Sequence, residues 1–204
     1  MISFIAFIYM IKKMSRKTGV NQNFFVGNIL TFVLTTFLFS RLFFVIAEWR
    51  DYKYLVEDRF INFFLMTDYN LSFVGGVTGF MIVLFYKLYR YQQTHEKYMD
   101  VVVVSFFFAA IIGYLAALFG GQIYGRPTSL PIGIVYQGDD VNIPYTSAVL
   151  PLALFYSILS FATFTILYII KEMFKIPGFI GYLGIGLFSV FLFVGEFFSG
   201  TEDI

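Results

Sequence analysis

Long apolar runs separated by short polar stretches dominate the chain. Five of these runs, at residues 24–49, 71–89, 101–119, 148–170 and 179–198, are long enough to cross a bilayer as helices, because about twenty apolar residues span the hydrocarbon core. An earlier run, residues 2–11, is shorter and ends in the basic sequence KKMSRK. The pattern predicts an all-α integral membrane protein: a bundle of about six transmembrane helices, the first one short, forming a single polytopic domain over residues 1–204.

Composition supports this class and excludes several kinds of chemistry. Hydrophobic residues make up 59% of the chain and charged residues 13%, which is more apolar surface than a soluble domain of 204 residues can bury. The chain has no cysteine and a single histidine, His95, so disulfides, a cysteine nucleophile and the usual metal sites are not expected. We expect no metal and no cofactor. The net charge of +1 gives no reason to expect nucleic acid as a partner.

The charged residues between the runs indicate how the chain is oriented. When residues 2–11 are counted as the first of six runs, the first, third and fifth runs are followed by most of the basic residues. These are Lys12, Lys13, Arg16, Lys17, Lys87, Arg90, Lys97, Lys171 and Lys175. The other loops are mainly acidic; one of them, residues 48–58, is predicted to be aqueous, with a short surface helix extending to Leu65. By the positive-inside rule the basic loops face the cytoplasm. The outer end of the second run, the start of the third, the end of the sixth and residues 120–131 then face outward.

The polar stretch GGQIYGRPTSLP, residues 120–131, lies where a predicted helix leaves the membrane. Arginine is costly near hydrocarbon unless it meets an anion, so Arg126 is a candidate functional residue. Gly120, Gly121 and Gly125 allow tight turns and a close approach of the backbone to a ligand. The alternative is an ordinary interfacial loop whose arginine is solvated or bound to any lipid phosphate.

Two other features border the apolar runs. The third run begins VGGVTG, and its glycines at Gly75, Gly76 and Gly79 allow either close helix contact or a locally opened backbone. Asp100 is predicted to stand at the start of the fourth helix, where the helix dipole favours a negative charge. His95 is predicted to be a solvated loop residue.

Five segments in order then point to a known family. SRLFFV, residues 40–45, is similar to a Gly-Ala-Arg helix and places its arginine at Arg41. LSFVGGVTG, residues 71–79, is similar to a segment in which a histidine precedes paired glycines. Asp100 falls where an aspartate often opens the next helix. GYLAALFGGQIYGRPTSLP, residues 113–131, aligns without gaps with a signature around Gly-Arg-x-Gly-Asn-Phe, and IPGFIGYLG, residues 176–184, precedes a last helix carrying Glu196. Over residues 37–199 the chain resembles the bacterial prolipoprotein diacylglyceryl transferases.

The chain also departs from that family's pattern. The histidine before the paired glycines is replaced by Val74, and the arginine one helical turn before Glu196 is replaced by Leu192. The family's His-Pro-Ser-Gln-Leu-Tyr-Glu segment has NIPYTSAVLP, residues 142–151, in its place. Further signature positions are occupied by Tyr114, Ala117, Gly120 and Gln122. The lost residues are mostly those linked to catalysis, whereas the retained ones are mostly glycines and prolines that shape the backbone.

The resemblance implies an activity and a set of site residues. The family transfers diacylglyceryl from phosphatidylglycerol to the lipobox cysteine thiol of prolipoproteins, in the bacterial plasma membrane. The resemblance implies catalytic roles for Arg126, Tyr124 and Glu196, with Tyr124 or Glu196 acting as the base or orienting one. The lipid phosphate would be bound by Arg41, Arg126, Thr128, Gly75, Gly76, Gly121 and Gly125. The implied partners are phosphatidylglycerol or another anionic phospholipid, a lipoprotein signal peptide and the bilayer itself.

Other interpretations compete with this one. The chain could be a catalytically lapsed relative that binds lipid or a signal peptide. Arg41 and Glu196 could form an intramembrane ion pair that only holds two helices together, and Tyr124 could be an ordinary residue of the interfacial aromatic belt. A transporter or channel is disfavoured, because the sequence shows no inverted repeat and no paired ionisable residues at the midplane.

Overall fold

The computed structural model describes residues 1–47, 71–136, 145–174 and 176–200. The predicted aqueous loop and surface helix of residues 48–65 and Lys175 lie outside these ranges. The chain forms two compact units, one of Met1–Val20 with Glu96–Ile204 and one of Asn21–His95, called unit 1 and unit 2 below. The single polytopic domain stays a prediction. Within the described ranges, five helices are long and apolar enough to cross a membrane, which confirms the predicted class of helical membrane protein.

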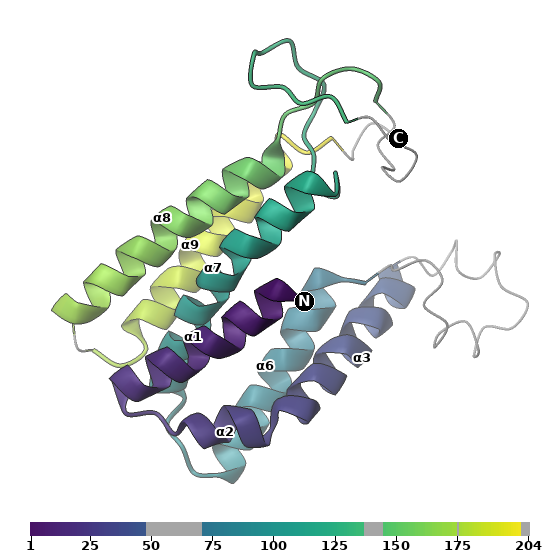
Figure 1. The fold of residues 1–204 in the computed structure, drawn as a ribbon. Coiled ribbons are helices and arrows are strands. Elements are labelled where there is room, and N and C mark those ends of the chain that lie inside the picture. Colours follow the sequence, from purple (N-terminus) through teal and green to yellow (C-terminus); the bar gives the residue numbers. More distant parts are fainter. Residues whose placement is uncertain (48–70, 137–144, 175, 201–204) are drawn as a thin grey trace, which may run out of the picture. The chain divides into compact units, whose positions relative to one another are not determined.

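Unit 1 contains helices α1 (Ile2–Thr18), α7 (His95–Phe119), α8 (Leu152–Met173) and α9 (Phe179–Glu196) (Figure 1). Helix α1 is longer than its apolar run, because lysine and arginine are good helix formers whose apolar stems can lie along the helix. It ends at Gly19, which adopts the left-handed conformation with φ 70° and donates its N–H to the Ser15 carbonyl. Glycine takes this conformation without strain, so it stops the helix at the end of the basic sequence.

The core of unit 1 lies between α7, α8 and α9. Val101, Val104 and Phe107 of α7 are completely buried, together with Ala153 of α8. Helix α9 approaches both neighbours closely through Gly184, where an added Cβ would stand 2.9 Å from the Leu167 side chain of α8 and 3.3 Å from the Phe107 side chain of α7. Small residues permit such approaches between membrane helices, where van der Waals packing replaces the hydrophobic effect.

Asp100 contacts a different helix from the one predicted. Helix α7 begins at His95, so Asp100 lies in its second turn and is buried. Its carboxylate accepts hydrogen bonds from the N–H groups of Gly178 (3.0 Å) and Gly181 (2.7 Å) at the start of α9. The predicted interaction between the carboxylate and the positive end of a helix dipole therefore occurs, but at the start of α9, whose first N–H groups have no carbonyl partner within their own helix. The prediction that His95 is a loop residue is wrong: His95 begins the helix and packs 6.1 Å from the Phe85 ring.

Unit 2 contains α2 (Gln22–Gly27), α3 (Ile29–Ala47) and α6 (Phe73–Arg90) (Figure 1). The sequence predicts one span over residues 24–49, whereas the structure breaks it at Asn28. The Asn28 amide donates to the Phe24 carbonyl at 2.7 Å, and its backbone is not helical, with φ −111° and ψ 10°. Asparagine competes in this way with the helical hydrogen bonds of the main chain, so the helix restarts after it.

The glycines of α6 pack against α3. A Cβ at Gly75 would lie 2.6 Å from the Phe43 Cβ, and a Cβ at Gly79 would lie 2.6 Å from the Phe39 Cβ. Helix α6 begins regularly, with the Ser72 hydroxyl accepting the Gly75 N–H at 3.2 Å. Of the two roles predicted for these glycines, close helix contact is therefore the one observed.

This packing gives a first testable prediction. Gly79→Ala is expected to lower the free energy of unfolding by about 1–2 kcal/mol, because the clash with Phe39 exceeds the gain in helix propensity. Thermal unfolding in detergent measures the effect. The matched control is Gly186→Ala in α9, where an added Cβ meets nothing within 4 Å and stability should hold or rise slightly. Equal stability of the two variants would contradict the tight α3–α6 contact.

Candidate functional site

The chain leaves α7 through a glycine turn. Gly121 is buried and has φ 61°, a left-handed conformation that favours glycine. The next N–H, that of Gln122, returns to the Ala117 carbonyl at 3.1 Å. This is the usual way to close the C-terminal turn of a helix. The turn sends residues 123–128 across the ends of α8 and α9 (Figure 1).

Backbone hydrogen bonds hold residues 124–126 between the start of α8 and the end of α9. The Gly125 N–H donates to the Leu150 carbonyl at 2.8 Å, and the Leu150 N–H donates back to the Arg126 carbonyl at 3.1 Å. On the other side, the Arg126 N–H donates to the Phe198 carbonyl at 3.1 Å. The Gly200 N–H donates to the Tyr124 carbonyl at 3.3 Å. The main chain around Arg126 is thus fixed from both sides.

Gly125 makes this close approach possible. An added Cβ would stand 2.7 Å from the Phe198 carbonyl oxygen and 2.8 Å from the Leu150 Cβ. Because the Gly125 N–H already donates to Leu150, the phosphate-binding role predicted for this amide gains no support. Gly121 is likewise part of a turn that the fold requires. Both glycines shape the loop.

Arg126 is exposed, and its side chain is oriented by the end of α9. Its Nε donates to the Ser199 carbonyl at 3.3 Å. Thr128 is half-buried, its N–H donates to the Ala148 carbonyl at 2.8 Å, and its hydroxyl accepts the Leu130 N–H at 3.2 Å. The Thr128 hydroxyl can still donate a hydrogen bond of its own, since a hydroxyl both donates and accepts. The loop therefore presents a guanidinium group on a rigid main chain.

Tyr124 packs beside a tyrosine that the sequence did not single out. The rings of Tyr124 and Tyr145 lie 6.2 Å apart, nearly edge to face. The Tyr145 hydroxyl donates to the Gly200 carbonyl at 3.1 Å. Tyr145 follows directly on residues 142–144, which lie outside the described ranges. Its place in a non-helical polar stretch gave no periodic pattern from which its contact could be inferred.

Glu196 is the last residue of α9 and is exposed. It lies at the same end of unit 1 as Arg126, because the Ser199 carbonyl that orients Arg126 is three residues further along the chain. Within unit 1, neither a hydrogen bond nor an ion pair engages the Glu196 carboxylate in the described residues. The structure thus brings Tyr124, Arg126 and Glu196 to one end of the unit.

A tyrosine pair borders Glu196. Tyr156 of α8 packs against Gly195, where an added Cβ would lie 2.8 Å from its ring carbon Cε1. The ring of Tyr114 lies 5.2 Å from that of Tyr156. Tyr114 occupies a signature position, but its partner was missed. One sequence feature could have indicated this contact. Gly195 directly precedes Glu196, the only acidic residue of α9, and a glycine at such a position leaves room for a bulky side chain.

The remaining predicted residues belong to unit 2. Arg41 is 4% exposed, and its guanidinium lies 5.5 Å from the Phe44 ring centroid. The N–H groups of Gly75 and Gly76 are bound by the hydroxyl and the carbonyl of Ser72, at 3.2 and 3.0 Å. These amides are therefore engaged within α6, and a role in binding phosphate gains no support. The predicted joint clamp of Arg41 with Arg126 and the alternative ion pair with Glu196 stay predictions.

The described residues define a polytopic helical membrane protein with an arginine-bearing loop fixed at one end of the helices of unit 1. A family model described as prolipoprotein diacylglyceryl transferase matches residues 1–204, and the chain belongs to this family. The match is wider than residues 37–199, the range over which the motifs resemble the family.

Individual relatives are distant. The chain is 23% identical over 199 residues to the phosphatidylglycerol–prolipoprotein diacylglyceryl transferase of Prochlorococcus marinus, covering 89% of this chain and 67% of that protein. It is 29% identical over 123 residues to the protein of that name from Deinococcus radiodurans, covering 59% and 36%. For the protein from Streptococcus suis the values are 27% over 118 residues, covering 55% and 42%. The matched parts thus span between about a third and two thirds of the relatives' own lengths.

Proposed function

We propose that the protein transfers diacylglyceryl from phosphatidylglycerol to the lipobox cysteine thiol of prolipoproteins; its relatives are named phosphatidylglycerol–prolipoprotein diacylglyceryl transferases. The observation that carries this proposal is the loop around Arg126. Backbone hydrogen bonds on both sides fix its main chain, and the Ser199 carbonyl orients its Nε. A preorganised guanidinium at a membrane surface is suited to a phosphate, because its planar fork matches two phosphate oxygens.

The chemistry needs two things that this end of unit 1 offers. The thiolate sulfur attacks the glycerol carbon of the diacylglyceryl group, a C–S bond forms, the C–O bond to phosphate breaks, and glycerol phosphate leaves with the electron pair. Negative charge grows on the phosphate oxygens, where Arg126 would stabilise it. The thiol proton must go to a base, because the thiol itself is a poor nucleophile. Glu196, exposed at the end of α9, or Tyr124 would accept it or orient the group that does.

The proposal includes an orientation. In unit 1 the basic residues Lys12, Lys13, Arg16 and Lys17 lie at the end of α1, Lys97 near the start of α7 and Lys171 near the end of α8. The loop around Arg126 follows the opposite end of α7. The positive-inside rule then directs the Arg126 loop outward from the plasma membrane, where a lipoprotein signal peptide is processed.

The test is transfer by the purified full chain. Phosphatidylglycerol labelled in its acyl chains is incubated with a lipobox peptide and, as a control, with the same peptide carrying serine in place of the cysteine. Label should appear on the thiol peptide and not on the serine peptide, with release of one glycerol phosphate per transfer. Absence of label on the thiol peptide under conditions where the protein stays folded would overturn the proposal.

One observation favours a second candidate, a lapsed relative that binds lipid or a signal peptide. Val74 takes the place of a histidine in the family pattern, and its side chain is 64% exposed on α6. An exposed apolar residue there can neither accept a proton nor bind phosphate. Binding of labelled phosphatidylglycerol without any transfer in the same assay would support this candidate.

A further inference from the structure

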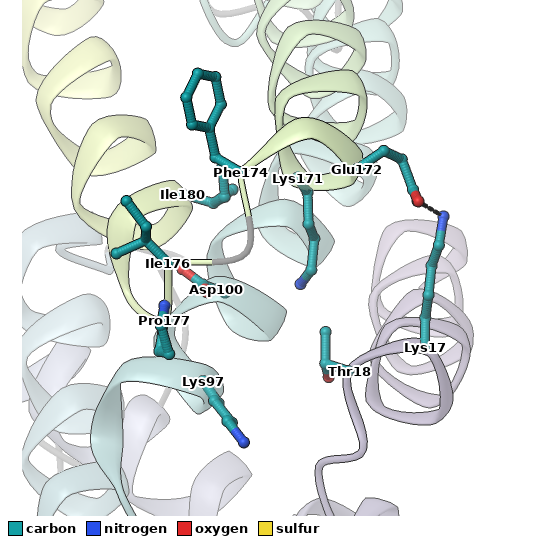
Figure 2. A pocket seen from close by; sticks show the side chains of 10 residues that line it. All are labelled: Lys17, Thr18, Lys97, Asp100, Lys171, Glu172, Phe174, Ile176, Pro177 and Ile180. Carbon is teal, nitrogen blue, oxygen red and sulfur yellow. Dashed lines mark ion pairs between the residues drawn. The ribbon is translucent and has the colours of Figure 1, made fainter.

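A polar cavity lies at the opposite end of unit 1 from the Arg126 loop. Its volume is about 290 Å³, and its walls come from α1, α7, α8 and the start of α9 (Figure 2). Five charged side chains line it: Lys17, Lys97, Asp100, Lys171 and Glu172. Three are cationic and two are anionic, so the local balance of charge depends on which of them already have partners.

Both carboxylates of the cavity are engaged. Asp100 accepts two hydrogen bonds, at 3.0 and 2.7 Å, from the N–H groups at the start of α9. Glu172 forms an ion pair with Lys17, drawn as a dashed line in Figure 2, and Lys17 also donates to the Tyr168 hydroxyl at 3.1 Å. These three side chains are thus held by contacts within the unit.

The other two lysines are not satisfied in this way. The Lys171 Nζ is buried and makes no hydrogen bond with any described residue; Figure 2 shows its side chain extending from α8 into the cavity. Asp100 attracts it through space but does not bond to it. Lys97 is exposed at the same cavity and likewise has no ion pair within the described ranges. A buried ammonium without a hydrogen-bond partner is costly, so the cavity lacks an anionic acceptor for Lys171.

The rim of the cavity adds an apolar surface. Phe174 is 48% exposed and Ile176 is 59% exposed, and both line the cavity beside Pro177. From this arrangement we propose that the cavity binds a phosphate group, with the Lys171 and Lys97 ammonium groups donating to its oxygens and with Phe174 and Ile176 contacting what the phosphate carries. Both an anionic phospholipid headgroup and free phosphate supply this chemistry. The site goes beyond the proposed function and does not depend on it.

The test needs a reporter at this cavity, because the Arg126 loop is also proposed to bind phospholipid. The chain has no cysteine, so Thr18→Cys gives a single attachment point for a trifluoromethyl label on the cavity wall. The labelled full chain in phosphatidylcholine nanodiscs is titrated by 19F NMR, in one arm with phosphatidylglycerol and in the other with inorganic phosphate. We expect a saturable shift in at least one arm. Saturation by phosphatidylglycerol alone identifies a lipid headgroup as the ligand, and saturation by inorganic phosphate alone identifies free phosphate. Saturation in both arms shows that the cavity recognises the phosphate group itself.

Variants then show whether the lysines form the site. Lys171→Gln is expected to raise the apparent Kd about tenfold, since it removes one charge-assisted hydrogen bond. Lys97→Gln should act in the same direction and serves if Lys171→Gln does not fold. The matched control is Lys13→Gln, an exposed lysine of α1 outside the cavity, for which the Kd should not change. A shift that does not saturate in either arm, or equal Kd values in all variants, would overturn the proposal.

Discussion

Arg126→Ala is expected to lower the rate of diacylglyceryl transfer by about two to three orders of magnitude, the usual loss when a preorganised donor to a developing oxyanion is removed. The main chain at this position is held by Leu150 and Phe198, so truncating the side chain should leave the loop in place. Arg126→Lys keeps the charge without the planar fork and should recover only part of the rate. Initial rates with labelled phosphatidylglycerol and a lipobox peptide measure both effects.

The control for this prediction is Arg90→Ala, which removes an exposed arginine at the end of α6 and should leave the rate unchanged. Thermal unfolding of each variant separates a catalytic loss from a folding defect. An Arg126→Ala protein that transfers at the normal rate would show that Arg126 belongs to an ordinary interfacial loop. If the parent protein binds phosphatidylglycerol without transferring it, and the Arg126→Ala variant no longer binds it, the result would support the lapsed relative.

Asp100→Ala is expected to lower the free energy of unfolding by about 3 kcal/mol. The change removes a buried carboxylate and leaves two buried N–H groups, those of Gly178 and Gly181, without their acceptor. Asp100→Asn keeps one acceptor oxygen and should lose roughly half as much. Unfolding by SDS in mixed micelles measures the differences.

A charged residue of the same cavity provides the comparison. Glu172→Gln breaks the ion pair with Lys17. The Lys17 side chain is 37% exposed and the Glu172 side chain is 55% exposed. An exposed pair contributes at most about 1 kcal/mol, so this variant should stay near the parent protein. If Asp100→Ala were no less stable than Glu172→Gln, the Asp100 carboxylate would not be what holds the start of α9.

Hydrophobic runs predicted the class of the protein and the five long apolar helices of the described residues, because about twenty apolar residues are enough to cross a bilayer as a helix. Their ends were less predictable. His95 begins α7 well before its apolar run, since polar residues such as Glu96 and Lys97 continue a helix without difficulty. Asn28 interrupts what reads as one span, and the reason is a local hydrogen bond to Phe24. Local propensities of this kind do not change the hydrophobic pattern, so the pattern cannot reveal them.

The residues of the candidate site stay a prediction, and the sequence did not reveal the contacts that the structure gives them. Arginine next to hydrocarbon made Arg126 conspicuous, and the structure brings it to the same end of unit 1 as Glu196. The structure shows that Gly75 and Gly125 allow a neighbouring helix or loop to approach closely, while the predicted binding roles of Gly75, Gly76 and Gly125 stay predictions, because a glycine that admits a ligand and one that admits a neighbouring segment look the same in sequence. Asp100 was expected to stabilise its own helix, and only the folded arrangement shows that it meets the start of α9.

The hydrogen bond between Arg126 and Ser199 joins residues 73 positions apart, and this spacing has a consequence for biosynthesis. At translation rates of about 5–20 residues per second, the loop leaves the ribosome roughly 4–15 seconds before its partner at the end of α9. During that interval no carbonyl from Phe198 or Ser199 orients the arginine. The guanidinium of the newly made protein therefore becomes oriented only after α9 and the residues that follow it, Phe198 and Ser199, have been synthesised.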